Sequence, residues 1–122
     1  MQGKRLVRVN QLIKEEISMV VQRQLKDPRL GFVTVTEVDT TPDLKRAKVF
    51  VSVLGPDAQW AASFKALESA RGFVWSWLRR HLDLRVTPEI MFRPDRSMEH
   101  AAHIQALLAD LKKSEASSET DE

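Results

Sequence analysis

The chain contains no cysteine, only four glycines, and no apolar run that approaches the roughly 20 residues of a membrane span. The lack of cysteine excludes disulfide bridges and thiolate metal sites, and it agrees with a cytosolic address. The first residues are basic, but no apolar signal-peptide region follows them. Together these absences predict a cytoplasmic protein without a membrane-spanning segment.

Catalytic motifs are also missing. The sequence has no phosphate-binding G-x-x-x-x-G-K-[ST] loop and no G-x-S-x-G nucleophile turn. Glu15 and Glu16 cannot act together as an acid–base pair, because adjacent residues on a helix point in different directions. His100 and His103 have a spacing at which two imidazoles could share a metal, but no nearby cysteine or second-helix histidine is evident that would complete a ligand set. We therefore expect a protein that is not an enzyme and needs no metal or cofactor.

The composition is that of a single globular domain. The 122 residues are 43% hydrophobic and 30% charged, which allows a two-layer core but not a deep cleft between domains. Residues 1–113 carry all 19 lysines and arginines against 13 acidic residues, whereas residues 114–122 carry four acids and no base. A basic body with an acidic end indicates a polyanionic partner for the body. We expect one monomeric domain over residues 1–111 and an acidic, disordered tail over residues 112–122.

The segment KDPRLGFVTVT, residues 26–36, predicts a helix that stops and a strand that starts within a few residues. Pro28 disfavours helical geometry at Asp27 and lacks the N–H that a longer helix would need. Gly31 is expected to permit the backbone conformation that re-aims the chain. The alternating, β-rich run from Phe32 onward predicts the first strand.

Hydrophobic spacing predicts the remaining helices and strands. Apolar residues from Val9 to Leu25, including Leu12, recur at helical spacing and predict an amphipathic helix of about five turns. Asp57 follows the second strand and is a candidate helix N-cap, and Phe73 is expected to face inward from the third helix. The expected elements are a helix over 9–25, strands over 32–38 and 46–54, helices over 58–70 and 73–82, a strand over 89–93 and a last helix over 98–111.

This order predicts an α+β fold in which helices cover one face of a three-stranded sheet, with an extra C-terminal helix. It is the order of the type II KH fold, an RNA-binding architecture. KH domains join their central helices with a GXXG loop that clamps nucleic-acid backbone, and the sequence has no GXXG. At the matching place stands Ala70-Arg71-Gly72. There Ala70 is expected to allow close approach, and Gly72 to supply the backbone freedom for a sharp interhelical kink.

Four segments carry a resemblance to ribosome-binding factor A, a family of bacterial small-subunit maturation factors. They are RVNQLIKEEI at 8–17, the junction at 26–36, AKVFVSVLG at 47–55, and residues 82–92 with their Thr-Pro-Glu. The segments occur in order over about residues 4–111. In this family the Ala-x-Gly kink replaces the GXXG loop. Trp75 departs from the family, which usually has a basic residue near that position.

The resemblance implies a non-catalytic factor that binds free or immature 30S subunits. It implies contacts with 16S rRNA near the decoding region and a role in late maturation, including processing of the 16S rRNA 5′ end. It also implies a functional link to an assembly GTPase and to initiation factor 3 when the factor leaves. No membrane and no small-molecule substrate are expected. The alternative is a KH-like protein–protein interaction module that uses its exposed sheet edge or its last helix.

The first group of predicted RNA contacts lies before and at the start of the N-terminal helix. Lys4, Arg5, Arg8 and Lys14 are candidates for phosphate contacts that position the protein on RNA. The alternative interpretation is a solvated helix start that aids solubility. The second group lies on the third helix and comprises Arg71, Trp75, Arg79 and Arg80. A helix that continues across the kink places residues 71, 75 and 79 on one stripe.

An exposed tryptophan between arginines suits base stacking, although Trp75 could instead pack against the C-terminal helix or a lysine stem.

The third group of candidates surrounds the junction and the second strand. Arg29 could alternatively cap helix-terminal carbonyls. The members of this group are Lys26, Arg29, Lys45, Arg46 and Lys48, with Arg85 and Arg93 as weaker candidates.

Overall fold

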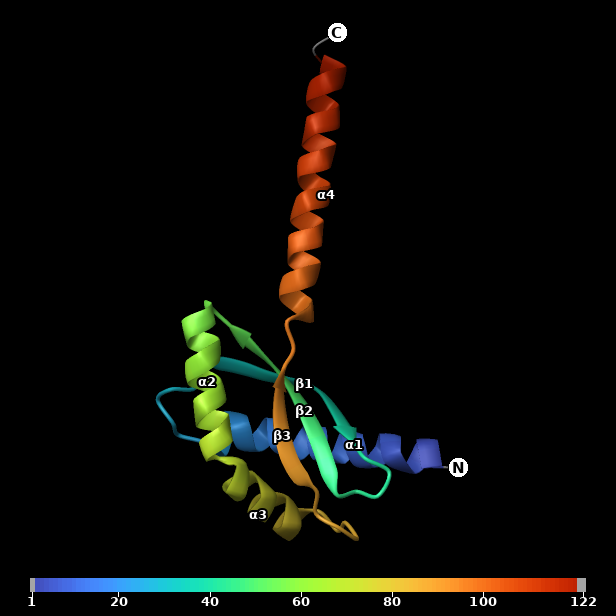
Figure 1. The fold of residues 1–122 in the computed structure, drawn as a ribbon, viewed down its shortest axis with the longest axis vertical. Helices are drawn as coiled ribbons and strands as arrows, with labels where there is room; N and C mark the ends of the chain where they lie inside the picture. The colour runs from blue at the N-terminus through green and yellow to red at the C-terminus, as the bar shows by residue number, and fades with distance from the viewer. Residues whose placement is uncertain (1, 121–122) are drawn as a thin grey trace.

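The computed structural model describes residues 2–120 of the chain and the side chains of residues 3–115. The predicted α+β class is confirmed, and the element order is that expected for a type II KH-like domain with an extra C-terminal helix (Figure 1). The elements are α1 (Gln2–Met19), a π-helical turn η1 (Val20–Gln24), β1 (Phe32–Thr40), β2 (Arg46–Leu54), α2 (Asp57–Ser69), α3 (Arg71–His81), β3 (Glu89–Pro94) and α4 (Ser97–Thr120).

The sheet has β2 at its centre, antiparallel to β1 and parallel to β3. Phe32 lies opposite Leu54 in the antiparallel pair, and Arg46 lies opposite Glu89 in the parallel pair. A tight turn can join β1 to β2, but a parallel neighbour requires a crossover connection, which α2 and α3 provide. Helices α1, α2 and α3 contact the strands, and together they cover one face of the sheet.

The core lies between that face and the three helices. In β2 the alternation is regular, with Val49 and Val51 fully buried and Lys48 exposed on the open face. Burying each large apolar side chain stabilises the fold by about 1.5–3 kcal/mol. The large apolar residues that are fully buried on the helices are Ile13, Ile17, Val20, Leu67, Val74 and Leu78.

Two residues predicted to face the core are substantially exposed. Leu12 is 39% exposed and Phe73 is 42% exposed. Both lie next to a fully buried position, Ile13 and Val74, and one residue on a helix corresponds to about 100° of rotation. The buried stripe of each helix is therefore narrower than the apolar spacing predicted.

The predicted N-cap at Asp57 is wrong. Pro56 occupies the cap position with an extended backbone, φ −71° and ψ 170°, and α2 begins at Asp57 itself. Asp57 makes no capping hydrogen bond, and its carboxylate pairs instead with Arg96 at 3.1 Å.

The interhelical kink occurs at Ala70, which ends α2 and precedes α3 with φ −90° and ψ −1°. The amide of Ala70 still donates to the carbonyl of Ala66 at 3.1 Å, so the chain turns without an intervening loop. Gly72 lies in the first turn of α3 without a positive φ, and nothing lies within 4 Å of where its Cβ would be. The expected need for backbone freedom at Gly72 is therefore wrong, because a helical residue with open space around it does not require glycine.

Gly31 also differs from its predicted role, since its φ is not positive. A Cβ at Gly31 would lie 2.5 Å from Nε2 of Gln59 in α2, so any larger residue would displace the Gln59 side chain. The Gly31 amide donates to Oγ of Ser63 at 3.1 Å, which fixes the start of β1 against α2.

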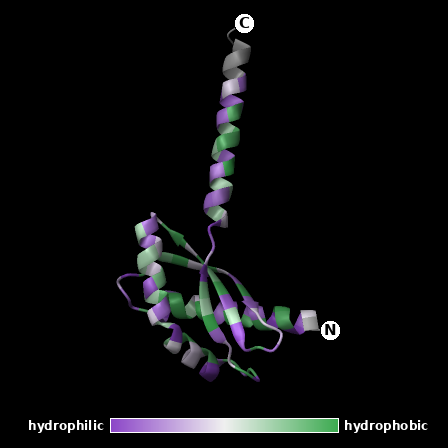
Figure 2. Cartoon of the chain, in the orientation of Figure 1, coloured by the Kyte–Doolittle hydropathy of each residue, from purple (hydrophilic) through white to green (hydrophobic). Residues whose placement is uncertain are grey.

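Helix α4 projects away from the body (Figure 1). The chain has no glycine or proline after Pro94, and the helix continues through residues 112–120, where the sequence predicts disorder. Residues 121–122 of the predicted tail lie outside the described residues. Figure 2 shows hydrophobic residues along α4, and four of them are 44–61% exposed: Ile104, Leu107, Leu108 and Leu111.

Candidate nucleic-acid interface

The N-terminal candidates lie on the first turns of α1. Lys4, Arg5 and Arg8 are exposed, whereas Lys14 is half-buried. The helix is fastened to the sheet nearby, because Oδ1 of Asn10 accepts a hydrogen bond from the amide of Thr40 at 2.9 Å. The exposed cations of α1 are thus held on a rigid element rather than on a loose chain end.

The predicted RNA contacts on α3 differ in whether their side chains already form an ion pair within the protein. Nε of Arg71 lies 3.1 Å from Oε1 of Glu68, so this guanidinium is occupied by an ion pair. Nε of Arg80 donates to the carbonyl of Ser76 at 3.3 Å, and the Arg80 side chain remains exposed. Arg79 lies over the Trp75 ring, 5.5 Å from its centroid, in a cation–π contact.

Trp75 is 36% exposed, and its indole N–H donates to the carbonyl of Thr87 at 3.3 Å. Trp75 packs against neither the C-terminal helix nor a lysine stem, which are the two packing partners predicted for it. Its contacts are Arg79 and the loop between α3 and β3. A shallow hollow of about 520 Å³ is lined by Trp75, Ser76, Arg79 and Arg80.

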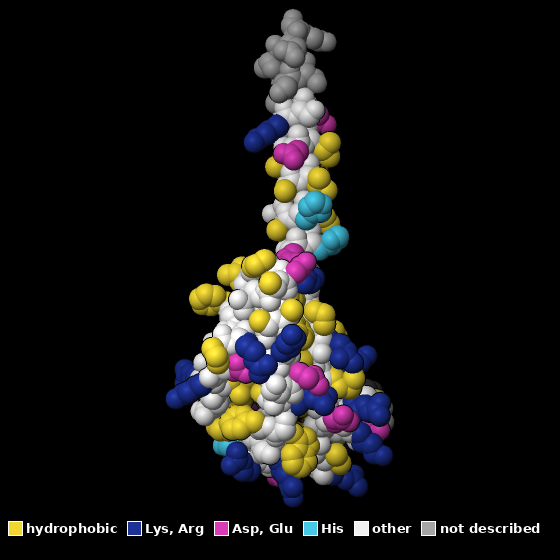
Figure 3. Space-filling view, turned by 60° about the vertical axis from the view of Figure 1, so that its left-hand side comes forward, with side chains coloured by type: hydrophobic (Ala, Val, Ile, Leu, Met, Phe, Trp, Pro, Cys, Tyr) yellow, Lys and Arg dark blue, Asp and Glu magenta, His cyan; other side chains and the backbone are white. Residues whose placement is uncertain are grey.

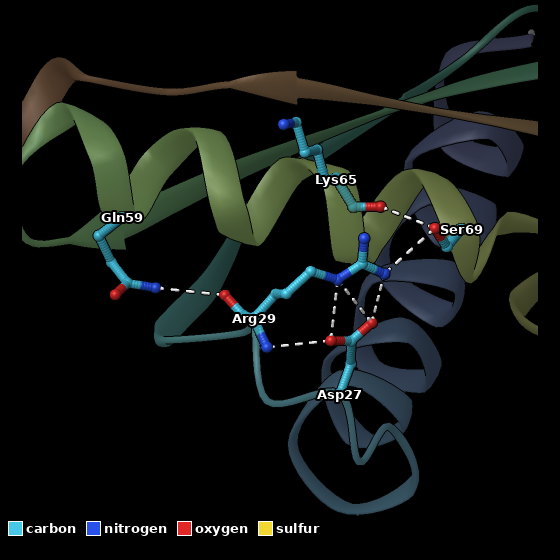
Figure 4. Close-up of polar contacts among 5 residues, drawn as sticks. All are labelled: Asp27, Arg29, Gln59, Lys65 and Ser69. Carbon is cyan, nitrogen blue, oxygen red and sulfur yellow. Dashed lines mark hydrogen bonds and ion pairs between the residues drawn. The ribbon is translucent and has the colours of Figure 1, made fainter.

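The junction after η1 is a closed network rather than a free basic patch (Figure 4). The guanidinium of Arg29 holds the Asp27 carboxylate, with 2.6 Å between Nη2 and Oδ2 and 3.0 Å between Nε and Oδ1. The Arg29 amide also donates a hydrogen bond to Oδ1 of the same carboxylate at 2.9 Å. These bonds lower the pKa of Asp27 from 3.8 to about 2, and the side-chain hydrogen bonding from Arg29 has the largest effect.

The same arginine ties the junction to α2. Its Nη2 donates to Oγ of Ser69 at 3.3 Å, and its carbonyl accepts from Nε2 of Gln59 at 3.3 Å. The guanidinium therefore contacts the Ser69 side chain at the end of α2 and does not cap the helix carbonyls. Lys26, its neighbour in the predicted group, is exposed.

The β-strand candidates are exposed around the β1–β2 turn and along β2. Lys48 lies opposite Asp39 in the sheet, and Arg46 lies opposite Glu89, so each faces an acidic residue across the strands. Lys45 belongs to the turn, where its amide donates to Oδ1 of Asp43 at 3.0 Å. Figure 3 shows lysine and arginine side chains spread over the body and few along α4.

The structure also brings together residues that the sequence keeps apart. Arg5 of α1, the β1–β2 turn and Arg85 of the loop after α3 line one pocket of about 360 Å³. From the sequence, Arg85 is one of the two weaker candidates. Only the fold places it beside the N-terminal cations.

The described residues contain no group of three or more His, Asp or Glu side chains placed to hold a metal ion. His100 and His103 are both exposed on α4. No helix within residues 2–120 is both long and apolar enough to cross a membrane. The arrangement offers cationic and aromatic side chains on a rigid body, which is chemistry suited to binding a polyanion.

A family model described as Ribosome-binding factor A matches residues 5–108. The chain is 48% identical over 112 residues to the Ribosome-binding factor A of Desulfitobacterium hafniense, covering 92% of this chain and 90% of that protein. The crystal structure of ribosome-binding factor A from Thermus thermophilus superimposes with a TM-score of 0.66 at 25% identity, covering 73% of this chain and 93% of that one.

A second Thermus thermophilus structure is a ribosome binding factor A homology model fitted into a cryo-EM map of a 30S–RbfA complex. It matches with a TM-score of 0.60 at 27% identity, covering 70% of this chain and 90% of that one. The sequence relatives and the solved structures therefore agree with the family model. This chain belongs to the ribosome-binding factor A family.

Proposed function

We propose that this protein is a ribosome-assembly factor that binds free or immature 30S subunits through 16S rRNA. Family membership carries the proposal, because a structurally similar member was fitted into a 30S–RbfA complex. The exposed cations of α1, the β1–β2 turn and α3 supply the matching chemistry. Lysine and arginine contacts with phosphates fix the position of a protein on RNA without reading its sequence.

The proposed action is binding without catalysis. The body docks on rRNA of an immature subunit and favours one RNA conformation over another by binding it more tightly. This bias assists late maturation, including processing of the 16S rRNA 5′ end. Release at the end of maturation would involve an assembly GTPase and initiation factor 3, partners that come from the family resemblance alone.

Not all the predicted contacts are equally available to RNA. Arg29 and Arg71 are engaged by Asp27 and Glu68. Among residues 3–115, no ion pair involves Lys4, Arg5 or Arg8. We therefore assign the leading phosphate contacts to α1 and give Arg29 and Arg71 mainly structural roles.

A second candidate function rests on α4. Ile104, Leu107, Leu108 and Leu111 form an apolar stripe that no part of residues 3–115 covers. An exposed apolar stripe on a helix is typical of a surface that contacts another protein. In this alternative, α4 contacts a protein partner and the body has no specific RNA target.

Co-sedimentation tests the proposal. The purified chain is mixed with small subunits, large subunits or whole ribosomes over a range of salt concentrations. Salt-sensitive association that is selective for free small subunits is expected. Equal association with all three particles would reduce the protein to a generic polycation, and association that ignores salt would favour the protein-contact function.

A further inference from the structure

A pocket lies beside Arg5, separate from the hollow on α3. It forms where the first turns of α1, the turn between β1 and β2, and the loop between α3 and β3 meet, and its volume is about 360 Å³. Its apolar lining comes from all three elements and includes Leu6, Leu44 and Val86. Its size lies at the lower end of the range for small-ligand sites, about 300–1,000 Å³.

The turn that forms one wall has a strained backbone and is held by hydrogen bonds. Leu44 has a φ of 61°, a conformation that side-chain-bearing residues rarely adopt. Hydrogen bonds hold the turn in place. The Leu44 amide donates to the Thr41 carbonyl at 2.8 Å, and the Thr41 hydroxyl donates to Oδ1 of Asp43 at 2.6 Å. Because Leu44 also packs against the core, its side chain keeps a fixed place in the pocket wall.

The polar groups of the pocket have a distinct arrangement. Arg5 and Arg85 come from different elements, and among residues 3–115 neither forms an ion pair. Asp43 is the single carboxylate in the lining. Its Oδ1 is used within the turn, whereas no hydrogen bond within the described part of the chain reaches its Oδ2. The lining of the pocket thus combines two arginines and one aspartate with apolar side chains.

We propose that this pocket receives one unpaired nucleotide of RNA, an inference that rests on the proposed rRNA-binding function. Apolar walls and guanidinium planes accommodate a flat, unstacked base, and the same guanidinium groups reach the adjoining phosphates. The free oxygen of Asp43 accepts a hydrogen bond from an amino group on the base. Adenine, guanine and cytosine carry such a group, and uracil does not.

The surroundings of the pocket favour a nucleic-acid strand over an isolated small molecule. Arg8, Lys45 and Arg46 are exposed on the elements that form its walls. The loop that carries Arg85 and Val86 also accepts the indole N–H of Trp75, so the aromatic and cationic hollow on α3 adjoins the same loop. A strand with one base in the pocket would therefore have cations along its path on both sides.

The test uses the full chain and short labelled RNA strands in fluorescence anisotropy. Val86 is 38% exposed, so Val86→Trp fills the pocket from the loop side without changing charge. Val7→Trp is the matched control, since Val7 is 67% exposed on α1 and does not line the pocket. The probes are pentaadenylate, pentauridylate and a fully paired RNA duplex.

We expect the unmodified chain to bind pentaadenylate more tightly than pentauridylate. Val86→Trp should weaken pentaadenylate binding about tenfold, the loss expected for one stacked base, and leave duplex binding unchanged. Val7→Trp should leave both affinities unchanged. Arg85→Ala, at an exposed loop position, should lower pentaadenylate affinity in the same direction and serves if Val86→Trp does not fold.

Three results would overturn the nucleotide assignment. These are no measurable binding of pentaadenylate, unchanged pentaadenylate affinity in Val86→Trp, and equal weakening of single-stranded and duplex RNA. If Val86→Trp loses 30S association but keeps its RNA affinity, the occupant is a protein side chain instead. Failure of the unmodified chain to associate with 30S subunits at all would reject the proposed function. Because this measurement uses the unmodified chain, it is distinguishable from any effect of the pocket variants.

Discussion

The indole N–H of Trp60 in α2 donates a hydrogen bond to the Glu99 carboxylate in the first turn of α4, with 3.1 Å between Nε1 and Oε1. Arg96 lies over the same ring, 4.0 Å from its centroid, and pairs with both Glu99 and Asp57. In the short segment between β3 and α4, the Asp95 carboxylate accepts a hydrogen bond from the amide of Ser97 at 2.9 Å. Helix α4 therefore leaves the body from a fixed base rather than from a free linker.

We predict that Arg96→Ala with Glu99→Ala frees the direction of α4 while barely changing stability. Exposed ion pairs of this kind contribute about 0–1 kcal/mol. Because the chain lacks cysteine, spin labels can be placed by Lys65→Cys on α2 and Gln105→Cys on α4. Their distance distribution should broaden in the double variant but not in a Lys112→Ala control. A distribution of unchanged width would mean that these contacts do not orient α4.

Two glycines should respond in opposite directions to alanine. At Gly31 a Cβ would displace the Gln59 side chain, which bonds to Ser63 at 3.1 Å, so Gly31→Ala should lower the free energy of unfolding by about 1 kcal/mol. At Gly72 the space is open and the backbone is helical, so Gly72→Ala should raise it by about 0.5–1 kcal/mol. Urea unfolding of both variants measures the signs. A destabilised Gly72→Ala would show that the kink needs glycine after all.

The Asp27–Arg29 pair predicts a specific pH dependence. The folded-state pKa of Asp27, about 2, lies below its ordinary value of 3.8. The ionised carboxylate therefore stabilises the fold above about pH 4, and this contribution is lost as the pH falls toward 2. The difference in unfolding free energy between the unmodified chain and Asp27→Asn should be constant near neutral pH and shrink over that acidic range. A difference that does not change with pH would contradict the assigned pKa.

The junction at residues 26–36 shows what local pattern can predict. Pro28 and the β-rich run correctly placed the end of the helix and the start of β1 at Phe32. The predicted role of Gly31 was wrong, because what a side chain there would meet is Gln59, 28 positions further along the chain. Contacts of that kind depend on how α2 packs on the sheet, which periodicity does not encode.

Helix α4 shows the opposite case. Its last apolar stripe residue is Leu111, so the apolar pattern predicts that the helix ends there. The residues that follow include no glycine or proline, so their helix propensity lets the helix continue.

The cations of the candidate site could be predicted from the sequence, but their arrangement in space could not. Residues 5, 43 and 85 converge only because the β1–β2 turn and the α3–β3 loop meet α1.

In the proposed function, the exposed cations of α1 contact rRNA phosphates. The most direct test is the salt dependence of 30S binding for the unmodified chain and for Arg5→Ala with Arg8→Ala. Plotted as log affinity against log salt concentration, the slope for the double variant should be shallower by about 1.5–2, the value for two lost phosphate contacts. Parallel slopes would contradict the account and remove α1 from the interface.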